Sequence, residues 1–289
     1  MIIAVAVVAI ICIAAAAVLL TNDKSDNEDN NAQTTITVWG STTVTPLMVK
    51  FQEAYENETN VRLNVGGNGS GEAVPALRNG TAQIGMLSRE LNSSEANGTT
   101  ALEIAGDAVV IIVDKDANIS NLTLEQVAKI YNGEYTNWSQ VGGANLKINP
   151  LIREANSGTR SCIDEFMAGA LGITVPDLAA KYTSYATHNS TGEMLTHANS
   201  VSGAIGYVNL GNLPDVNKSS SNVNSISIDG VVPSPATVDD KSYPISRGLI
   251  LATLGEPTGE VKAFLDWIMS PAGQTIVEQA DFVPVGPTS

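Results

Sequence analysis

The sequence is poor in the residues on which most enzymatic chemistry depends. Its 289 residues include only two histidines and two cysteines, Cys12 and Cys162. Cys12 lies in an apolar N-terminal stretch, so we expect no disulfide and predict that Cys162 is a small buried residue. A serine nucleophile needs a nearby base, but neither His188 nor His197 is flanked by a site motif, and both are expected on helix surfaces. No cysteine spacing or His/Asp cluster suggests a catalytic metal. A hydrolase or phosphatase is therefore disfavoured, and we expect no cofactor.

Positive charge is scarce as well. The chain has 15 Lys plus Arg against 30 Asp plus Glu, a formal net charge of −15. A nucleic-acid partner is not expected, because duplex binding requires a basic face. The acidity does not exclude a small anion. A local cage of N–H and O–H donors can bind one, since salt screens distant surface charge within about 10 Å.

The N-terminal twenty residues carry no charge. An apolar segment of this length can just span a bilayer as a helix. No basic segment or clear cleavage site accompanies it, so we expect a membrane anchor at 1–20, with a cleaved signal as the alternative. Residues 21–34 are rich in Asn and Asp and predict a flexible linker. We therefore expect the remainder at the outer face of the cytoplasmic membrane, or secreted if the segment is cleaved.

One strand–turn–helix unit stands out in the middle of the chain. The apolar run 148–152 leads into Arg153, then into Ser157-Gly158-Thr159, and then into a helical pattern. The first N–H groups of a helix lack internal partners and lie at the positive end of its dipole. Arg153 would add a planar fork of donors, and the hydroxyl groups would add more. This order suits a tetrahedral oxyanion, although Ser157 as a simple helix cap is the alternative.

Similar hydroxyl-rich turns follow other predicted strands. They occupy residues 40–43, 67–71, 88–89 and 157–159. The turn at 67–71 is no nucleotide P-loop, because no Gly-Lys-Ser/Thr follows it. Strands alternating with helices predict an α/β fold, and the continuous apolar run 108–113 predicts a strand covered on both faces. Ligands bind beyond the carboxyl ends of strands in open α/β sheets, so we expect these turns to share one anion site.

Several blocks, in this order, resemble the substrate-binding proteins of phosphate-specific ABC transporters. The resemblance extends from Thr35 to about Pro287. The blocks are Gly40-Ser41-Thr42-Thr43, Asn68-Gly69-Ser70-Gly71, Ile84 to Glu90, Asn137-Trp138 with Gly142-Gly143, Arg153 with Ser157 to Arg160, Ala204-Ile205-Gly206-Tyr207, and Tyr243-Pro244 with Ser246-Arg247. Each block alone is weak evidence for the family, but the whole set in this order is specific for it.

The resemblance implies a bilobal, periplasmic-binding-protein-like fold of type II. Two α/β lobes would be joined by crossover strands near Ala108–Val113 and Ile245–Leu251, and would close on phosphate held in the cleft. The first lobe would comprise 35–108 and 250–289, and the second 109–249. The resemblance further implies a monomer that delivers inorganic phosphate to ABC permease subunits for import.

It also implies a set of phosphate-binding positions. These are Ser41, Thr42, Thr43, Ser70, Ser88, Arg89, Asp107, Arg153, Ser157, Gly158 and Thr159. Some family members carry an aspartate at the position of Arg89, where it accepts a phosphate proton and so discriminates against sulfate. Because this chain has arginine there, the acceptor must lie elsewhere. Asp107, just before the buried strand, is the candidate acceptor, and the alternative is that it caps a neighbouring turn at the strand end.

Two other binding functions stay open on the same fold. The ligand could be another tetrahedral oxyanion, such as sulfate, molybdate or tungstate, or the protein could be a surface adhesion or signalling module. Asn-x-Ser/Thr sequences at Asn57, Asn92, Asn97 and Asn121 are candidate glycosylation sites on an extracellular protein.

Overall fold

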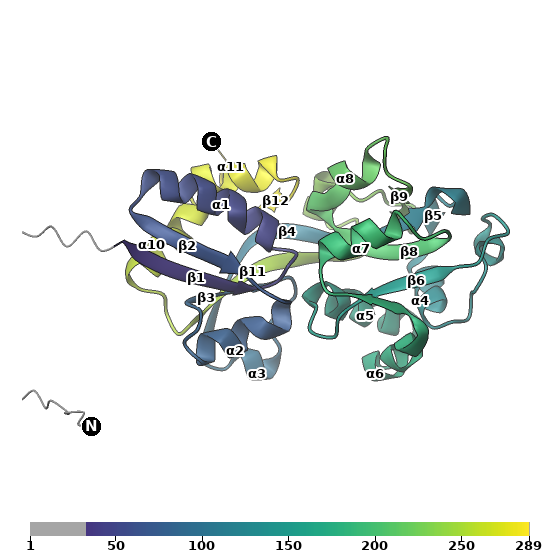
Figure 1. Ribbon diagram of the computed structural model, residues 1–289, viewed down its shortest axis with the longest axis horizontal. Helices are drawn as coiled ribbons and strands as arrows, with labels where there is room; N and C mark the ends of the chain where they lie inside the picture. The colour runs from purple at the N-terminus through teal and green to yellow at the C-terminus, as the bar shows by residue number, and fades with distance from the viewer. Residues whose placement is uncertain (1–32, 289) are drawn as a thin grey trace, which may run out of the picture. The chain divides into compact units, whose positions relative to one another are not determined.

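The computed structural model describes residues 33–288. Its main sheet has the strand order β2-β1-β3-β11-β4-β8-β6-β7, with β9 and β12 also paired to β4 (Figure 1). β10 pairs separately with β5. The strands are β1 (Thr34–Gly40), β2 (Val61–Gly66), β3 (Ile84–Leu87), β4 (Thr99–Asp114), β5 (Asn121–Leu122), β6 (Asn149–Arg153), β7 (Ala186–His188), β8 (Ala204–Asn209), β9 (Val223–Ser225), β10 (Ser227–Ile228), β11 (Ser246–Leu254) and β12 (Val283–Pro284).

Helices connect most of these strands, which confirms the predicted α/β class. They are α1 (Thr45–Glu58), α2 (Ala73–Arg78), α3 (Ser93–Ala96), α4 (Leu124–Tyr131), α5 (Gly158–Leu171), α6 (Val175–Ala179), α7 (Thr191–Ala198), α8 (Leu213–Asn217), α9 (Pro235–Asp239), α10 (Gly259–Ile268) and α11 (Pro271–Gln279). Local sequence explains where many of them begin. At α4, for example, Thr123 and Gln126 each accept the other's backbone N–H through their side chains, a reciprocal cap.

The fold is bilobal, and one long strand belongs to both lobes. β4 begins at Thr99, well before the predicted apolar run 108–113. Its first half pairs antiparallel with β11, whereas its second half pairs with β8 and β9. The first five residues of β4 are exposed or half-buried and include polar side chains, so no continuous apolar run marks them in the sequence. The lobe boundaries expected at 108/109 and 249/250 stay predictions.

The C-terminal helices pack against the first helix of the chain. The ring of Tyr55 in α1 lies 4.8 Å from that of Phe264 in α10, centroid to centroid, and 5.2 Å from that of Trp267. Phe51 meets Trp267 edge to face. Such aromatic contacts bury much apolar surface and fix the relative orientation of the helices. The two ends of the described chain are thereby joined in one lobe (Figure 1).

One local prediction was wrong. Both histidines were expected on helix surfaces, and His197 does lie in α7, but His188 ends β7, is buried, and contacts His197. The short strand β9, within residues 217–227, pairs with β4. Long-range pairing forms both short strands, and local periodicity carries no signal for it.

The predicted anchor, residues 1–20, and residues 21–32 of the predicted linker lie outside the described residues. Within 33–288, no helix combines the length and apolarity needed to cross a bilayer.

Candidate functional site

The carboxyl ends of several strands bring the hydroxyl-rich turns together. β1 pairs in parallel with both β2 and β3, so the turns after these strands lie at one edge of the sheet. β6 ends at Arg153, directly before the turn that opens α5. The predicted convergence of these turns is confirmed by the contacts described below.

Three serines of the first lobe form one buried cluster. Ser41 Oγ donates to Ser88 Oγ at 3.0 Å, and Ser70 Oγ lies 3.3 Å from Ser88 Oγ. The backbone N–H of Ser88 donates to Ser70 Oγ at 3.0 Å. All three residues are buried, although each comes from a different turn. Hydroxyl groups both donate and accept, so this cluster can direct its protons to a bound anion.

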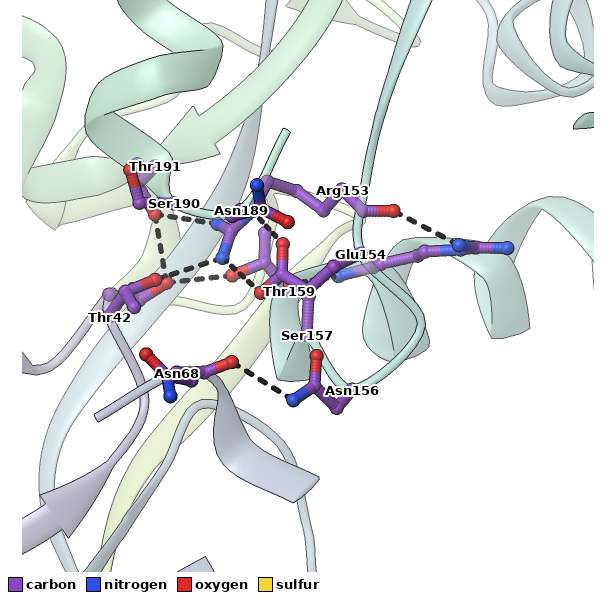
Figure 2. Close-up of polar contacts among 12 residues, drawn as sticks. Thr42, Asn68, Arg153, Glu154, Asn156, Ser157, Thr159, Asn189, Ser190 and Thr191 are labelled. Carbon is purple, nitrogen blue, oxygen red and sulfur yellow. Dashed lines mark hydrogen bonds and ion pairs between the residues drawn. The ribbon is translucent and has the colours of Figure 1, made fainter. Parts of the chain in front are cut away.

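Threonines and Arg153 form a second cluster that connects the lobes (Figure 2). Arg153 Nη2 donates to Thr42 Oγ1 and Nη1 to Thr191 Oγ1, both at 2.9 Å. Thr43 Oγ1 lies 2.8 Å from Thr159 Oγ1 and 3.2 Å from Thr191 Oγ1. Thr42 and Thr43 follow β1, whereas the other three residues belong to the second lobe. Residues separated by more than 100 positions therefore share one polar site.

Gly158, the first residue of α5, allows the helix to approach the serine cluster. A Cβ atom at this position would lie 2.2 Å from Ser70 Oγ and 2.8 Å from Ser88 Oγ. No larger residue fits without displacing these hydroxyl groups. Ser157 caps the helix, accepting the N–H of Arg160 at 3.2 Å. The capping alternative for Ser157 is thus correct for its side chain, and the positive end of α5 faces the serine cluster.

The charge of Arg153 is balanced by its neighbour in sequence. Arg153 is 1% exposed, and its Nε and Nη2 each donate to a carboxylate oxygen of Glu154 at 2.7 Å. Its backbone N–H donates to the hydroxyl of Tyr207 at 2.9 Å. Burial raises the pKa of Tyr207, so this hydroxyl stays protonated. These contacts fix the guanidinium while leaving it hydrogen-bonded to the threonines.

A second arginine holds the backbone of Arg153. Arg160 Nη1 donates to the carbonyl of Arg153 at 3.0 Å, and its Nε donates to Asp164 at 3.3 Å. The guanidinium also stacks over the ring of Tyr182, which donates to Asp164 at 2.6 Å. Burial raises the pKa of Asp164, and the hydrogen bonds from Tyr182 and Arg160 partly oppose this shift. The strand end that carries Arg153 is therefore held from two sides.

Comparison with known proteins identifies the family of this chain. The family model of the PBP superfamily domain matches residues 25–272. The phosphate-binding protein PstS of Borreliella burgdorferi is 30% identical over 262 residues, which cover 90% of this chain and 92% of the relative. The chain belongs to this phosphate-binding family of the PBP superfamily.

Solved structures share the fold. A Clostridium perfringens protein with bound phosphate, assigned as an ABC transporter substrate-binding protein, is 30% identical, with a TM-score of 0.79, covering 87% of this chain and 99% of its own. An ABC-type phosphate transport receptor from Vibrio cholerae is also 30% identical, with a TM-score of 0.70 and coverage of 86% and 99%. The expected bilobal architecture of the family is thereby confirmed.

Two positions expected from the family resemblance have other partners in this chain. The guanidinium of Arg89 donates to both oxygens of Glu95, at 2.6 and 2.8 Å. Burial alone would raise the pKa of Glu95, but hydrogen bonds from Arg89 and the Asn92 N–H outweigh it and lower the pKa. Among the described residues, the side chain of Arg89 makes no hydrogen bond to the hydroxyl clusters. Its role in phosphate binding stays a prediction.

Asp107 lies in the middle of β4 rather than at the start of the strand. It is fully buried and accepts from Arg247 Nε at 2.8 Å and from the Leu210 N–H at 2.9 Å. Arg247 in turn donates to the carbonyl of Ser88 at 2.9 Å. Asp107 therefore reaches the serine cluster through Arg247. Its proposed role as the acceptor of the phosphate proton stays a prediction.

Sequence reasoning missed two members of the site, Thr191 and Glu154. Thr191 opens α7 after the short strand β7, and Ser190 caps that helix by accepting the Glu193 N–H at 3.0 Å. The signal was present as Ser190-Thr191-Gly192, another hydroxyl-glycine turn between a strand and a helix. The strand has only three residues, so its pattern was too short to recognise. Glu154 could have been suspected from its position beside Arg153.

The arrangement offers several kinds of donor for binding an oxyanion. Hydroxyl groups, helix N–H groups and one balanced guanidinium are donors for an oxyanion. Within residues 33–288, no three His, Cys, Asp or Glu side chains are grouped so as to hold a metal ion. The two histidines contact each other, His188 Nε2 to His197 Nδ1 at 3.1 Å, rather than a serine of the cluster.

Proposed function

We propose that this protein binds inorganic phosphate outside the cytoplasm and delivers it to the permease of an ABC importer. The convergence of donors from both lobes on one polar site carries the proposal, above all Arg153 with Thr42 and Thr191. The phosphate-binding relatives and the phosphate-bound neighbour structure support the choice of anion. We further propose that the protein acts as a monomer, at the membrane surface or in secreted form.

We propose the phosphate-binding set to be the positions expected from the sequence, with Thr191 added. Half a dozen donors suffice energetically. Micromolar affinity corresponds to about −8 kcal/mol, and each hydrogen bond to a charged group contributes about 1.5–3 kcal/mol before ordering costs. Arg153 is expected to contribute most, because it is charged, buried and fixed in orientation.

The anion is bound and released unchanged in this proposal. The hydroxyl groups of the site bond to one another and to Arg153, and none of them pairs with a histidine among the described residues. A serine nucleophile without a base is weak. A chromogenic phosphate ester should therefore not be turned over.

One observation favours a second candidate, another tetrahedral oxyanion such as sulfate. Two carboxylates linked to the clusters, Glu154 and Asp107, are engaged by arginine. Glu154 accepts from Arg153 through both oxygens, and Asp107 accepts from Arg247 and Leu210. A proton on phosphate needs an acceptor, whereas sulfate carries no such proton. Selectivity thus depends on whether Asp107 can accept a further hydrogen bond.

Titration calorimetry with phosphate and with sulfate, from pH 5 to 8, tests the proposal. Micromolar or tighter phosphate binding with at least tenfold weaker sulfate binding is expected. Sulfate displacing phosphate at equal concentration would favour the second candidate. No binding of either anion would favour an adhesion or signalling role instead.

A further inference from the structure

Asn156 joins the two lobes through the backbone of the glycine-rich turn. Its carbonyl accepts the N–H of Gly71 at 2.9 Å. Its Nδ2 donates to the carbonyl of Asn68 at 3.0 Å (Figure 2). Nδ2 also donates to Glu72 Oε1 at 3.4 Å. Asn156 precedes α5 in the second lobe, whereas its partners follow β2 in the first. These contacts are separate from the hydroxyl clusters.

The contact with Asn156 requires residues without a Cβ atom in the turn. A Cβ atom at Gly69 would lie 2.8 Å from the carbonyl oxygen of Asn156, and one at Gly71 would lie 2.9 Å from its Cβ. The three nearest neighbours of a Cβ at Gly71 all belong to Asn156. Ser70, between the two glycines, faces the other way and bonds to Ser88. The turn thus presents its serine to the proposed anion site and its glycines to Asn156.

We propose that Asn156 is a closure latch that sets the affinity and the release rate for the anion by stabilising contact between the lobes. This inference rests on the proposed phosphate-binding function. Opening of the cleft would separate Asn156 from Asn68 and Gly71. The hydrogen bonds of Asn156 therefore stabilise only the closed form. The apparent affinity of a ligand that binds only the closed form is its intrinsic affinity multiplied by the fraction of protein that is closed. The latch raises this closed fraction without contacting the hydroxyl clusters.

A glycine-to-alanine exchange tests the latch with little effect on either lobe alone. Gly71→Ala adds one methyl group whose nearest contacts are all with Asn156, and Gly71 has no positive φ that would strain alanine. We expect phosphate affinity to fall roughly tenfold or more, because overlap at a packed contact is costly. Gly169→Ala is the matched control. Gly169 lies in α5, also without a positive φ, and a Cβ there has open space. This variant should bind phosphate like the wild type.

A second substitution separates the latch from a direct role of Gly71 in binding. Asn156→Gly removes the Cβ that the new methyl group meets. The double variant Gly71→Ala/Asn156→Gly should therefore bind phosphate within about threefold of Asn156→Gly alone. Asn156→Gly by itself should bind several-fold more weakly than the wild type, since it loses two hydrogen bonds across the cleft. A Gly71→Ala defect that persists in the double variant, or no defect in Gly71→Ala, would overturn the latch.

Small-angle X-ray scattering distinguishes failure of the latch from failure of the proposed function. At phosphate concentrations that saturate the wild type, Gly71→Ala should retain a larger radius of gyration than the wild type and Gly169→Ala. If the wild type binds no phosphate, the proposed function fails. The radii of gyration of the ligand-free proteins then test the latch. A larger radius for Gly71→Ala than for both others would then support it, and equal radii would refute it.

Discussion

Arg153 and Thr42 lie 111 positions apart in the chain, yet the guanidinium Nη2 donates to the threonine hydroxyl at 2.9 Å. This bond connects the end of β6 in the second lobe with the turn after β1 in the first. Because Glu154 neutralises the guanidinium at the same time, Arg153 positions donors without imposing a net charge on the site. The affinity for an anion should therefore depend on hydrogen-bond geometry more than on net charge.

Replacing Arg153 should abolish phosphate binding. Arg153→Ala is expected to weaken binding at least 100-fold, since it removes a charged donor that two hydroxyl groups contact. Calorimetry measures the loss, and circular dichroism checks the fold. Arg62→Ala is the control, because Arg62 is exposed and, in the described chain, its side chain pairs only with the half-buried Glu56 and with Gln33. Micromolar binding in Arg153→Ala would contradict the site.

Thr191 should contribute to affinity although the sequence did not predict it. Thr191→Val keeps the shape of the side chain and removes the hydroxyl that bonds to Arg153 and contacts Thr43. We expect roughly tenfold weaker phosphate binding. Thr196→Val, on the exposed face of the same helix, should leave the affinity unchanged. Equal phosphate affinities of the two variants would show that Thr191 does not contribute to binding.

Asp107→Asn should lower the melting temperature. Asp107 and Arg247 form a buried ion pair at 2.8 Å, and losing one partner leaves the other charge uncompensated, at a cost of about 3–5 kcal/mol. Calorimetric melting measures this effect. Binding by the same variant then tests the acceptor role. Weaker phosphate binding with unchanged sulfate binding supports this role. Equally weaker binding of both anions would show instead that Asp107 acts by holding Arg247 in position.

Cys162 should be unreactive in the folded protein. Burial raises its pKa to about 11, so at pH 8 only about one molecule in a thousand carries the reactive thiolate. In a Cys12→Ser variant, Cys162 is the remaining cysteine of the sequence. Iodoacetamide should then label the unfolded chain rapidly and the native protein at least 100-fold more slowly. Rapid labelling of the native protein would contradict the buried position.

Stability should decline as the pH falls through the range where histidine titrates. Burial first, and then the positive charges of His197 and Arg153, lower the pKa of His188. Glu193 and Glu154 oppose the shift without cancelling it. Because the unfolded chain then binds the proton more readily, protonation favours unfolding below about pH 6.5.

The melting temperature between about pH 7.5 and 5 measures this decline. His188→Gln should show a smaller decrease than the wild type, because glutamine does not titrate. The carboxyl groups are the same in both proteins, so their contribution to the decrease in melting temperature cancels in the comparison. A steeper decrease in the variant would show that His188 does not carry the effect.

The sequence by itself determined the α/β class and the places where the polar turns occur. Both follow from local rules. A short apolar strand followed by a hydroxyl-glycine turn and an amphipathic helix can be recognised over about twenty residues, as around Arg153. The parallel pairing of β1 with β2 and β3 then brings the turns after these strands to one edge. That is why the convergence of Ser41, Ser70 and Ser88 could be predicted.

Only the tertiary structure decided which polar groups pair. Arg89 lies beside hydroxyl turns in the sequence but pairs with Glu95, whereas Arg247 pairs with Asp107 across 140 positions. Thr191 and the cross-lobe contacts of Asn156 depend on how the second lobe meets the first. Hydrogen bonds and ion pairs require atoms within about 3 Å. Distances between segments far apart in the chain are set by the packing of whole elements, which no local pattern encodes.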